Sequence, residues 1–189
     1  MESLREAFKQ IRDERQDPQY PLADVLTLIC LGMLCGCNSV RAIARWVKRH
    51  RWELRERFAF RRKKLPGLGT LQRVIWQVDA QALALVVGQW GEAVLQVCGQ
   101  SELEGIALDG KTLRGSATQE LPALHLLSGL SHRLHVVLGQ VEVGDKTNEI
   151  PCALPLLTEL VLEGRVITTD ALLTQDKIAR QIVEKKGIT

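Results

Sequence analysis

The spacing of hydrophobic residues changes near residue 100. Before that point apolar side chains recur at three- and four-residue intervals, the period of amphipathic and buried helices. This pattern predicts helices over residues 2–15, 21–37, 40–58, 71–78 and 80–97. After that point, apolar runs of strand length cover residues 106–109, 124–130, 135–143 and 166–170, and helical patterns cover 149–160 and 174–186. We therefore expect an all-helical region, residues 1–100, followed by an α/β region, residues 101–189, so that the fold is α+β overall.

The order of elements in the second region also predicts how its strands run. Two or three neighbouring strands come first, then a helix, a further strand and a second helix. A helix between two strands is long enough to carry the chain back to the same end of a sheet, so at least one pair of strands is expected to be parallel. The second region should therefore contain a mixed sheet.

Charge is distributed unevenly along the chain. The net charge is only +3, but the stretch from Val40 to Lys64 holds eleven Lys and Arg residues against two acids, a net +9. The rest of the chain is therefore at −6. Such asymmetry is expected of a protein that binds a polyanion, because basic side chains near phosphates release counterions. Basic residues on the solvated face of a packed helix would give the same pattern and remain an alternative.

A pair of helices joined by a short turn contains the start of this basic stretch. The helices predicted over 21–37 and 40–58 flank a Gly-Cys-Asn-Ser turn, which resembles a helix-turn-helix in outline. One face of the second helix is apolar and the opposite face is basic. The residues predicted to face double-stranded DNA are Arg41, Arg45, Lys48 and Arg49.

Two aspartates close two of the predicted strands. Asp109 follows Ile-Ala-Leu and Asp170 follows Val-Ile-Thr-Thr. If these strands are parallel neighbours, their carboxyl ends bring both carboxylates to one edge of the sheet, where oxygen ligands suit Mg²⁺. A hairpin turn at Asp109 and a helix cap at Asp170 are the simpler explanations of the same residues.

Composition indicates the class of protein and its compartment. Hydrophobic residues make up 46% and charged residues 25%, as in globular proteins. Five cysteines without regular ligand spacing favour a reducing compartment over a disulfide scaffold. The longest apolar run is shorter than the ~20 residues that a membrane-spanning helix needs. We therefore expect a cytoplasmic protein.

Several segments together resemble a known family. They are IALDGKTLRGS, LHLLSGLS, VLGQVEVGDKTNEI and ITTDALLTQ. In order and spacing they resemble the DDE-type transposases of bacterial insertion sequences, in particular the H-repeat-associated group. The segment IRDERQDPQYPLADVLTLICLGMLCGCNSVRAIARW is similar to the helical leader of that family, which is taken to bind DNA, so the resemblance spans nearly the whole chain.

The resemblance implies a partial ribonuclease-H-like catalytic domain that cuts and joins DNA with Mg²⁺. It maps the first two catalytic and metal-binding acids onto Asp109 and Asp170 and implies that the protein acts as a homo-oligomer on DNA ends. Lys111 and Arg114 are then further candidates for DNA contact. The family continues into another strand and a helix bearing a third acid, a glutamate, and neither Asp176 nor Glu184 matches it. We therefore expect a truncated form, and a non-catalytic DNA-binding remnant or regulator is the alternative.

Other residues have competing interpretations. The residues GIALDGKT, 105–112, match the P-loop pattern of nucleotide hydrolases, but the sequence lacks the strand, loop and helix that this motif requires. His125, His132 and His135 fall in or between strands and are expected to be packed or surface residues. Glu149 is explained by the favourable charge of an acid at a helix N-terminus.

Overall fold

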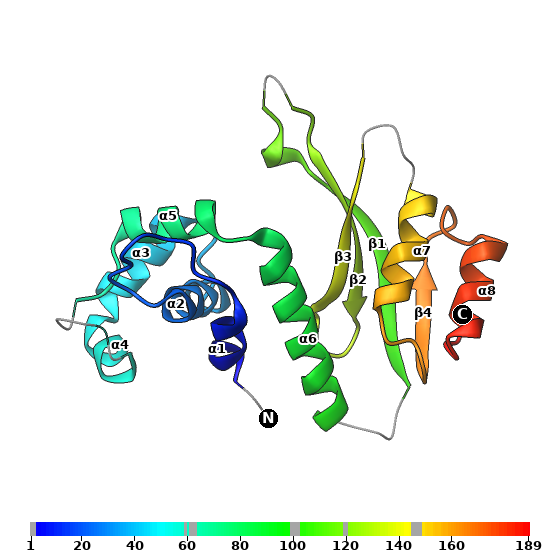
Figure 1. Ribbon diagram of the computed structural model, residues 1–189, viewed down its shortest axis with the longest axis horizontal. Coiled ribbons are helices and arrows are strands. Elements are labelled where there is room, and N and C mark those ends of the chain that lie inside the picture. Colours follow the sequence, from blue (N-terminus) through cyan, green and yellow to red (C-terminus); the bar gives the residue numbers. More distant parts are fainter. Residues whose placement is uncertain (1–2, 59, 61–63, 99–102, 119–120, 145–148) are drawn as a thin grey trace. The chain divides into compact units, whose positions relative to one another are not determined.

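The computed structural model describes residues 3–58, 60, 64–98, 103–118, 121–144 and 149–189 (Figure 1). Its helices and four-stranded mixed sheet confirm the expected α+β fold. The chain divides into two compact units, Glu2–Val86 and Val87–Thr189. The predicted domain boundary at residue 100 lies outside the described residues and stays a prediction. No described helix has the length and apolar character that crossing a membrane requires.

The first unit is helical. Its elements are α1 (Leu4–Ala7), the 3-10 helix η1 (Phe8–Gln10), α2 (Leu22–Leu34), α3 (Val40–Arg49), α4 (Arg51–Arg57), α5 (Leu68–Gln77) and the start of α6 (Ala80–Cys98). The side chains of Val25 and Leu28 on α2 are completely buried, as is that of Leu71 on α5. Gly32 lets α2 approach α3 closely, since a Cβ at this position would lie 3.0 Å from Ile43. The buried apolar faces predicted from the sequence therefore form the core of this unit.

Two predicted helices of this unit differ from the observed ones. The predicted helix over 2–15 ends at Gln10, after which Ile11 is extended and buried. Arg15 there donates to both carboxylate oxygens of Asp13, at 2.7 Å each, and to the Tyr20 carbonyl, and these side-chain bonds hold the segment in a non-helical course. The hydrogen bonds from Arg15 also lower the pKa of Asp13.

The predicted helix over 40–58 is two helices. Ser39 caps α3 by accepting a hydrogen bond from the Ala42 amide, as its residue type predicts. The chain leaves helical geometry at His50, which ends α3 and precedes α4. The basic residues of 40–58 are therefore carried by two helices rather than by one continuous face.

The second unit contains the sheet. Its strands are β1 (Glu104–Leu113), β2 (Leu124–Ser131), β3 (Val137–Val143) and β4 (Arg165–Thr169), in the order β3-β2-β1-β4. β1 pairs antiparallel with β2, and β2 with β3, whereas β4 is parallel to β1. Between β3 and β4 the chain forms α7 (Glu149–Glu159), and α8 (Asp176–Glu184) follows β4. This crossover confirms the predicted parallel pair.

β1 is longer than predicted and does not end at Asp109. It continues to Leu113, because residues as far as Leu113 pair with β2, and the turn of the hairpin follows at the 3-10 helix η3 (Arg114–Ser116). Asp109 is therefore neither a strand end nor a hairpin turn. The P-loop alternative also loses its basis, because residues 105–112 form one continuous strand and no phosphate-binding loop.

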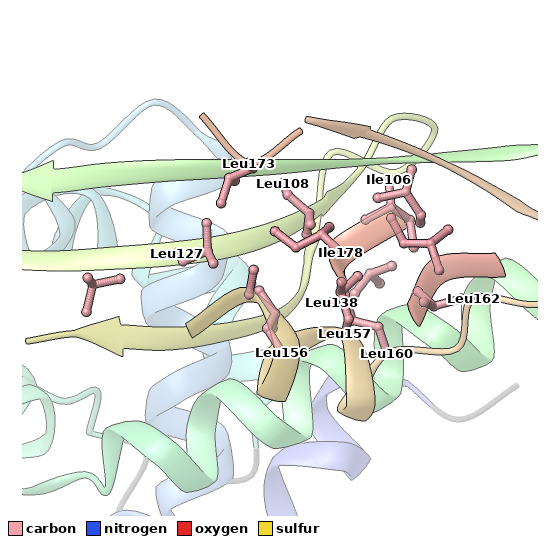
Figure 2. Close-up of a cluster of buried hydrophobic side chains, with 14 of the residues drawn as sticks. Ile106, Leu108, Leu127, Leu138, Leu156, Leu157, Leu160, Leu162, Leu173 and Ile178 are labelled. Atoms are coloured by element: carbon pink, nitrogen blue, oxygen red, sulfur yellow. The ribbon is translucent and has the colours of Figure 1, made fainter. Parts of the chain in front are cut away.

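The core of the second unit lies between the sheet and the helices that follow β3. It contains Ile106 and Leu108 of β1, Leu127 of β2 and Ile167 of β4. The helical residues packed with them include Leu156, Leu157 and Leu160 of α7 and Ile178 and Ile182 of α8. Figure 2 shows leucines of α7 against the strands. Alternate residues of β1 are thus buried on one face, and the opposite face is available to Asp109.

Polar contacts fix the edges of this core. Arg165, at the start of β4 and only 7% exposed, donates to both carboxylate oxygens of Glu92 on α6. Lys185, just after α8, donates to the carbonyls of Leu157, Thr158 and Leu160 at the end of α7, at 2.9, 2.6 and 3.0 Å. A lysine at these unpaired carbonyls stabilises the helix terminus. The first contact joins β4 to α6, and the second joins the end of α8 to the end of α7.

A glycine on α6 provides the first testable feature. A Cβ at Gly88 would lie 2.2 Å from the Leu138 carbonyl oxygen of β3, and a backbone atom cannot move aside as a side chain can. We expect Gly88→Ala to lower the free energy of unfolding by about 1–3 kcal/mol, although alanine is the better helix former. Urea denaturation measures the change.

Gly69→Ala is the matched control, because Gly69 also lies in a helix and a Cβ there meets nothing within 4 Å. This substitution should be neutral or should stabilise by up to about 1 kcal/mol. Equal effects of the two substitutions would contradict the close approach of α6 and β3.

Candidate functional site

Asp109 lies in β1, and Asp170 directly follows the last residue of the neighbouring parallel strand β4. The parallel pairing of β1 and β4 ends at Leu108 opposite Thr169, and the two aspartates follow these residues directly. Adjacent strands lie about 4.8 Å apart, which puts both backbones within reach of one cation. Both side chains are exposed. The two acids that the sequence singled out thus follow the last paired residues of β1 and β4, although β1 itself does not end at Asp109, and a cation shared between them stays a prediction.

The register places further polar residues on the same face of the sheet. Asp109 is opposite Ser128 of β2, and Ser128 is opposite Gln140 of β3. Residues directly opposite share a face, so these three form a row across the sheet on the side away from Leu108. Lys111, two residues after Asp109, belongs to the same face and is exposed. Sequence reasoning missed Ser128 and Gln140, because only the strand pairing shows that they align with Asp109.

Asp170 is held by the turn that ends β4. Its Oδ1 accepts a hydrogen bond from the Leu173 amide at 3.0 Å, and its backbone carbonyl accepts one from the Thr174 hydroxyl at 2.9 Å. A carboxylate has several lone pairs, so Oδ2 remains available to a ligand. The sequence-based alternative of a helix cap at Asp170 is wrong, because α8 (Asp176–Glu184) has Gln175 at its N-cap and Asp170 closes the preceding turn instead. The hydrogen bond in this turn is compatible with metal binding.

The donor set fits a hard divalent cation. Two carboxylates on adjacent strands, with solvent access, are the oxygen ligands that Mg²⁺ and Mn²⁺ prefer. Within the described ranges no group of three or more His, Cys, Asp or Glu residues is placed to hold a metal ion. A cation at Asp109 and Asp170 would therefore have at most two carboxylate ligands among the described residues, and water or substrate would take its remaining coordination positions.

The helical unit contains a groove of about 930 Å³ that is lined by basic side chains. The basic residues in its lining are Arg41, Arg45, Lys48, Arg51, Arg55 and Lys64. No acidic residue lines it, and none of these six makes an ion pair with a described acid. Apolar lining comes from Val47, Leu65 and Pro66. Positive charge that no acid neutralises is therefore concentrated in one concave surface.

Arg55 is the most enclosed basic group of this groove. Its Nε is buried and has no hydrogen-bond partner among the described residues. Arg55 and Arg51 also pack on Trp52, with guanidinium carbons 5.4 and 5.1 Å from the ring centroid, and Trp52 is 63% exposed. Buried hydrogen-bond donors normally have partners. An anion bound in the groove could accept the hydrogen bond that the Arg55 Nε–H does not make within the protein.

The predicted DNA-binding residues are only partly brought together. Arg41, Arg45 and Lys48 line the groove, whereas Arg49 is exposed but does not line it. Arg114 lies in η3, beyond Lys111 on the same hairpin. The sequence analysis did not name Arg51, Arg55 and Lys64 individually, although all three belong to the basic stretch that it identified.

A basic helical unit joined to a mixed sheet with paired aspartates is the combination expected of a DDE-type transposase, the class that the sequence resembles. The comparisons with known proteins agree. Residues 5–91 match the family described as DDE_Tnp_1-associated. The chain is 31% identical over 192 residues to "Putative transposase YncI" of Escherichia coli strain K12, an alignment that covers 99% of the chain and 75% of that relative. The chain belongs to the DDE-type transposase family, in its H-repeat-associated group.

Other relatives are longer. "Putative transposase YncI" of Escherichia coli O157:H7 is 32% identical over 192 residues, and "H repeat-associated putative transposase YhhI" of strain K12 is 29% identical over 192 residues. The alignments cover 99% of this chain but 48% and 50% of the two relatives, so the chain spans about half of their length. No solved structure matches the chain.

Proposed function

We propose that the chain is a transposase-type protein that binds double-stranded DNA and holds Mg²⁺ at Asp109 and Asp170. The observation that supports the proposal is the register of β1 and β4, whose last pair, Leu108 and Thr169, is followed directly by the two aspartates. Mg²⁺ at such a site supplies charge stabilisation and an activated oxygen nucleophile for attack on a phosphodiester. Asp109 and Asp170 would hold the ion, and Lys111 on the same face would contact the phosphate strand.

The second unit is proposed to be a ribonuclease-H-like domain. The support is its topology: three antiparallel strands in the order β3-β2-β1 and a fourth strand, β4, parallel to β1 after a helical crossover. On the outer edge of β4, Ile188 forms a parallel bridge with Val166 and exchanges backbone hydrogen bonds at 2.7 and 2.8 Å with Ile167 and Arg165. This edge is the place where such a fold adds a further strand.

The basic groove of the helical unit is proposed to bind the DNA backbone. Six basic side chains in a groove that no acidic residue lines favour a polyanion, and the unpartnered Arg55 Nε favours an oxygen acceptor such as phosphate. Phosphate contacts of this kind position a protein without reading sequence. We also propose that the protein acts on DNA ends as a homo-oligomer and that it is cytoplasmic. Both statements rest on the family alone.

A DNA-binding regulator without catalysis is the second candidate. It is favoured by the two-carboxylate site, because two-metal phosphodiester chemistry uses additional acidic ligands. One experiment distinguishes the two candidate functions. The purified chain is incubated with Mn²⁺ and with DNA that carries the ends of the insertion element. Nicking that is lost in Asp109→Asn and Asp170→Asn supports the catalytic proposal. DNA binding without nicking supports the regulator.

A further inference from the structure

A chain of hydrogen bonds joins β1, β2 and α7 on the face of the sheet opposite to Asp109. The Thr112 hydroxyl lies 2.8 Å from His125 Nδ1, and His125 Nε2 lies 2.7 Å from Glu149 Oε1. A carboxylate only accepts, so Nε2 donates to Glu149 and, in the neutral ring, the Thr112 hydroxyl donates to Nδ1. The His125 and Glu149 side chains are only 28% and 22% exposed. This arrangement orients Glu149 more firmly than a helix terminus alone requires.

The Glu149 carboxylate rests directly on the residue after Asp109. A Cβ at Gly110 would lie 2.0 Å from Glu149 Oε1 and 2.4 Å from its Cδ, and the three nearest atoms all belong to Glu149. Only glycine at position 110 allows this contact. The first residue of α7 thereby packs against the backbone of β1, one residue from the proposed metal ligand.

The position of this contact along β1 gives it a consequence for the site. β1 is paired on both sides as far as Leu108, but from Asp109 to Leu113 its pairing is with β2 alone. A strand segment with one neighbour twists and shifts more easily than one with two. Glu149 contacts the segment at the point where the support of β4 ends.

We propose that Glu149 is a positioning residue for the Asp109–Asp170 pair, acting through Gly110 and oriented by His125. The inference rests on the proposed metal site and deepens it. Residues that orient a metal site without binding the ion commonly change metal affinity by about 10- to 100-fold when they are replaced. Because Glu149 acts through backbone, the lower end of this range applies.

The test measures Mn²⁺ binding to the full chain by electron paramagnetic resonance. Glu149→Ala should weaken binding about tenfold, and His125→Leu should have a similar effect. Glu149→Gln keeps the contact with Gly110 and an oxygen that accepts from His125, so it should stay close to the wild type. His125→Gln should restore part of the affinity, because its amide can still donate to Glu149. Glu142→Gln is the control, since Glu142 is an exposed carboxylate on β3 with the same charge. Its Mn²⁺ affinity should equal that of the wild type.

A double-substitution cycle tests the contact itself. Gly110→Ala should weaken Mn²⁺ binding in the wild-type background, but it should have little effect in a Glu149→Ala background, where the clashing carboxylate is gone. Wild-type protein that binds no Mn²⁺ contradicts the proposed metal site, and with it this inference. Wild-type binding that Glu149→Ala leaves unchanged, with additive effects in the cycle, overturns the positioning role alone.

Discussion

Simultaneous replacement of Arg41, Arg45 and Lys48 by alanine is expected to flatten the salt dependence of DNA binding. All three line the basic groove and are exposed, and none is paired with a described acid. If each contacts one phosphate, the slope of log K against log[salt] should fall by about 2.7, which corresponds to about a 100- to 1,000-fold loss of affinity near 0.1 M salt. Fluorescence anisotropy with a labelled duplex, over about 0.05 to 0.2 M salt, measures both quantities.

The matched control removes the same charge elsewhere in the helical unit. Lys9, Arg12 and Arg73 are exposed and do not line the groove. Their triple alanine variant should keep the wild-type slope apart from a small general effect of net charge. An unchanged slope in the groove variant, or an equal change in both variants, would place the DNA surface outside the groove.

The second large effect is expected at the paired aspartates. Asp109→Asn and Asp170→Asn each remove one of two formal charges next to a divalent ion, a loss of about 3 kcal/mol even at the dielectric constant of water. Mn²⁺ affinity should therefore fall about a hundredfold in either variant. Isothermal titration calorimetry measures it. The fold should persist, because an asparagine at 170 can still accept the hydrogen bond from the Leu173 amide.

Asp17→Asn is the control for this pair of variants. Asp17 lies in the helical unit and has a positive φ of 42°, a conformation that asparagine also tolerates. Its Mn²⁺ binding should match the wild type. Loss of binding in only one of the two aspartate variants would show that the ion is held by a single carboxylate and would contradict a shared site.

The sequence predicted the α+β class and the parallel crossover, because these depend on local patterns, whereas metal binding by Asp109 and Asp170 stays a prediction. Alternation of buried residues marks Ile106 and Leu108, and a parallel partner follows from the helix between strands. The full length of β1 could not be predicted, because its second half is polar and is a strand only through its pairing with β2. That pairing depends on residues distant in sequence.

The groove and the Glu149 contact were missed for the same reason. The break at His50 divides the basic stretch between α3 and α4, and the stretch alone does not show that Arg55 and Lys64 line the same groove. Glu149 has a sufficient local explanation as an acid at a helix start. Its hydrogen bond to His125 and its contact with Gly110 join segments that are 24 or more residues apart. Only the folded chain reveals them.

Cleavage of the protein backbone by bound Fe²⁺ tests the central claim most directly. Fe²⁺ occupies oxygen sites that take Mg²⁺, and with ascorbate and peroxide it produces hydroxyl radicals that cut the chain next to the ion. One shared site predicts cuts near both Asp109 and Asp170, their loss together in Asp109→Asn, and competition by Mg²⁺. Cuts near only one of the two residues, or cuts near Asp170 that persist in Asp109→Asn, would contradict a cation shared by the two strands.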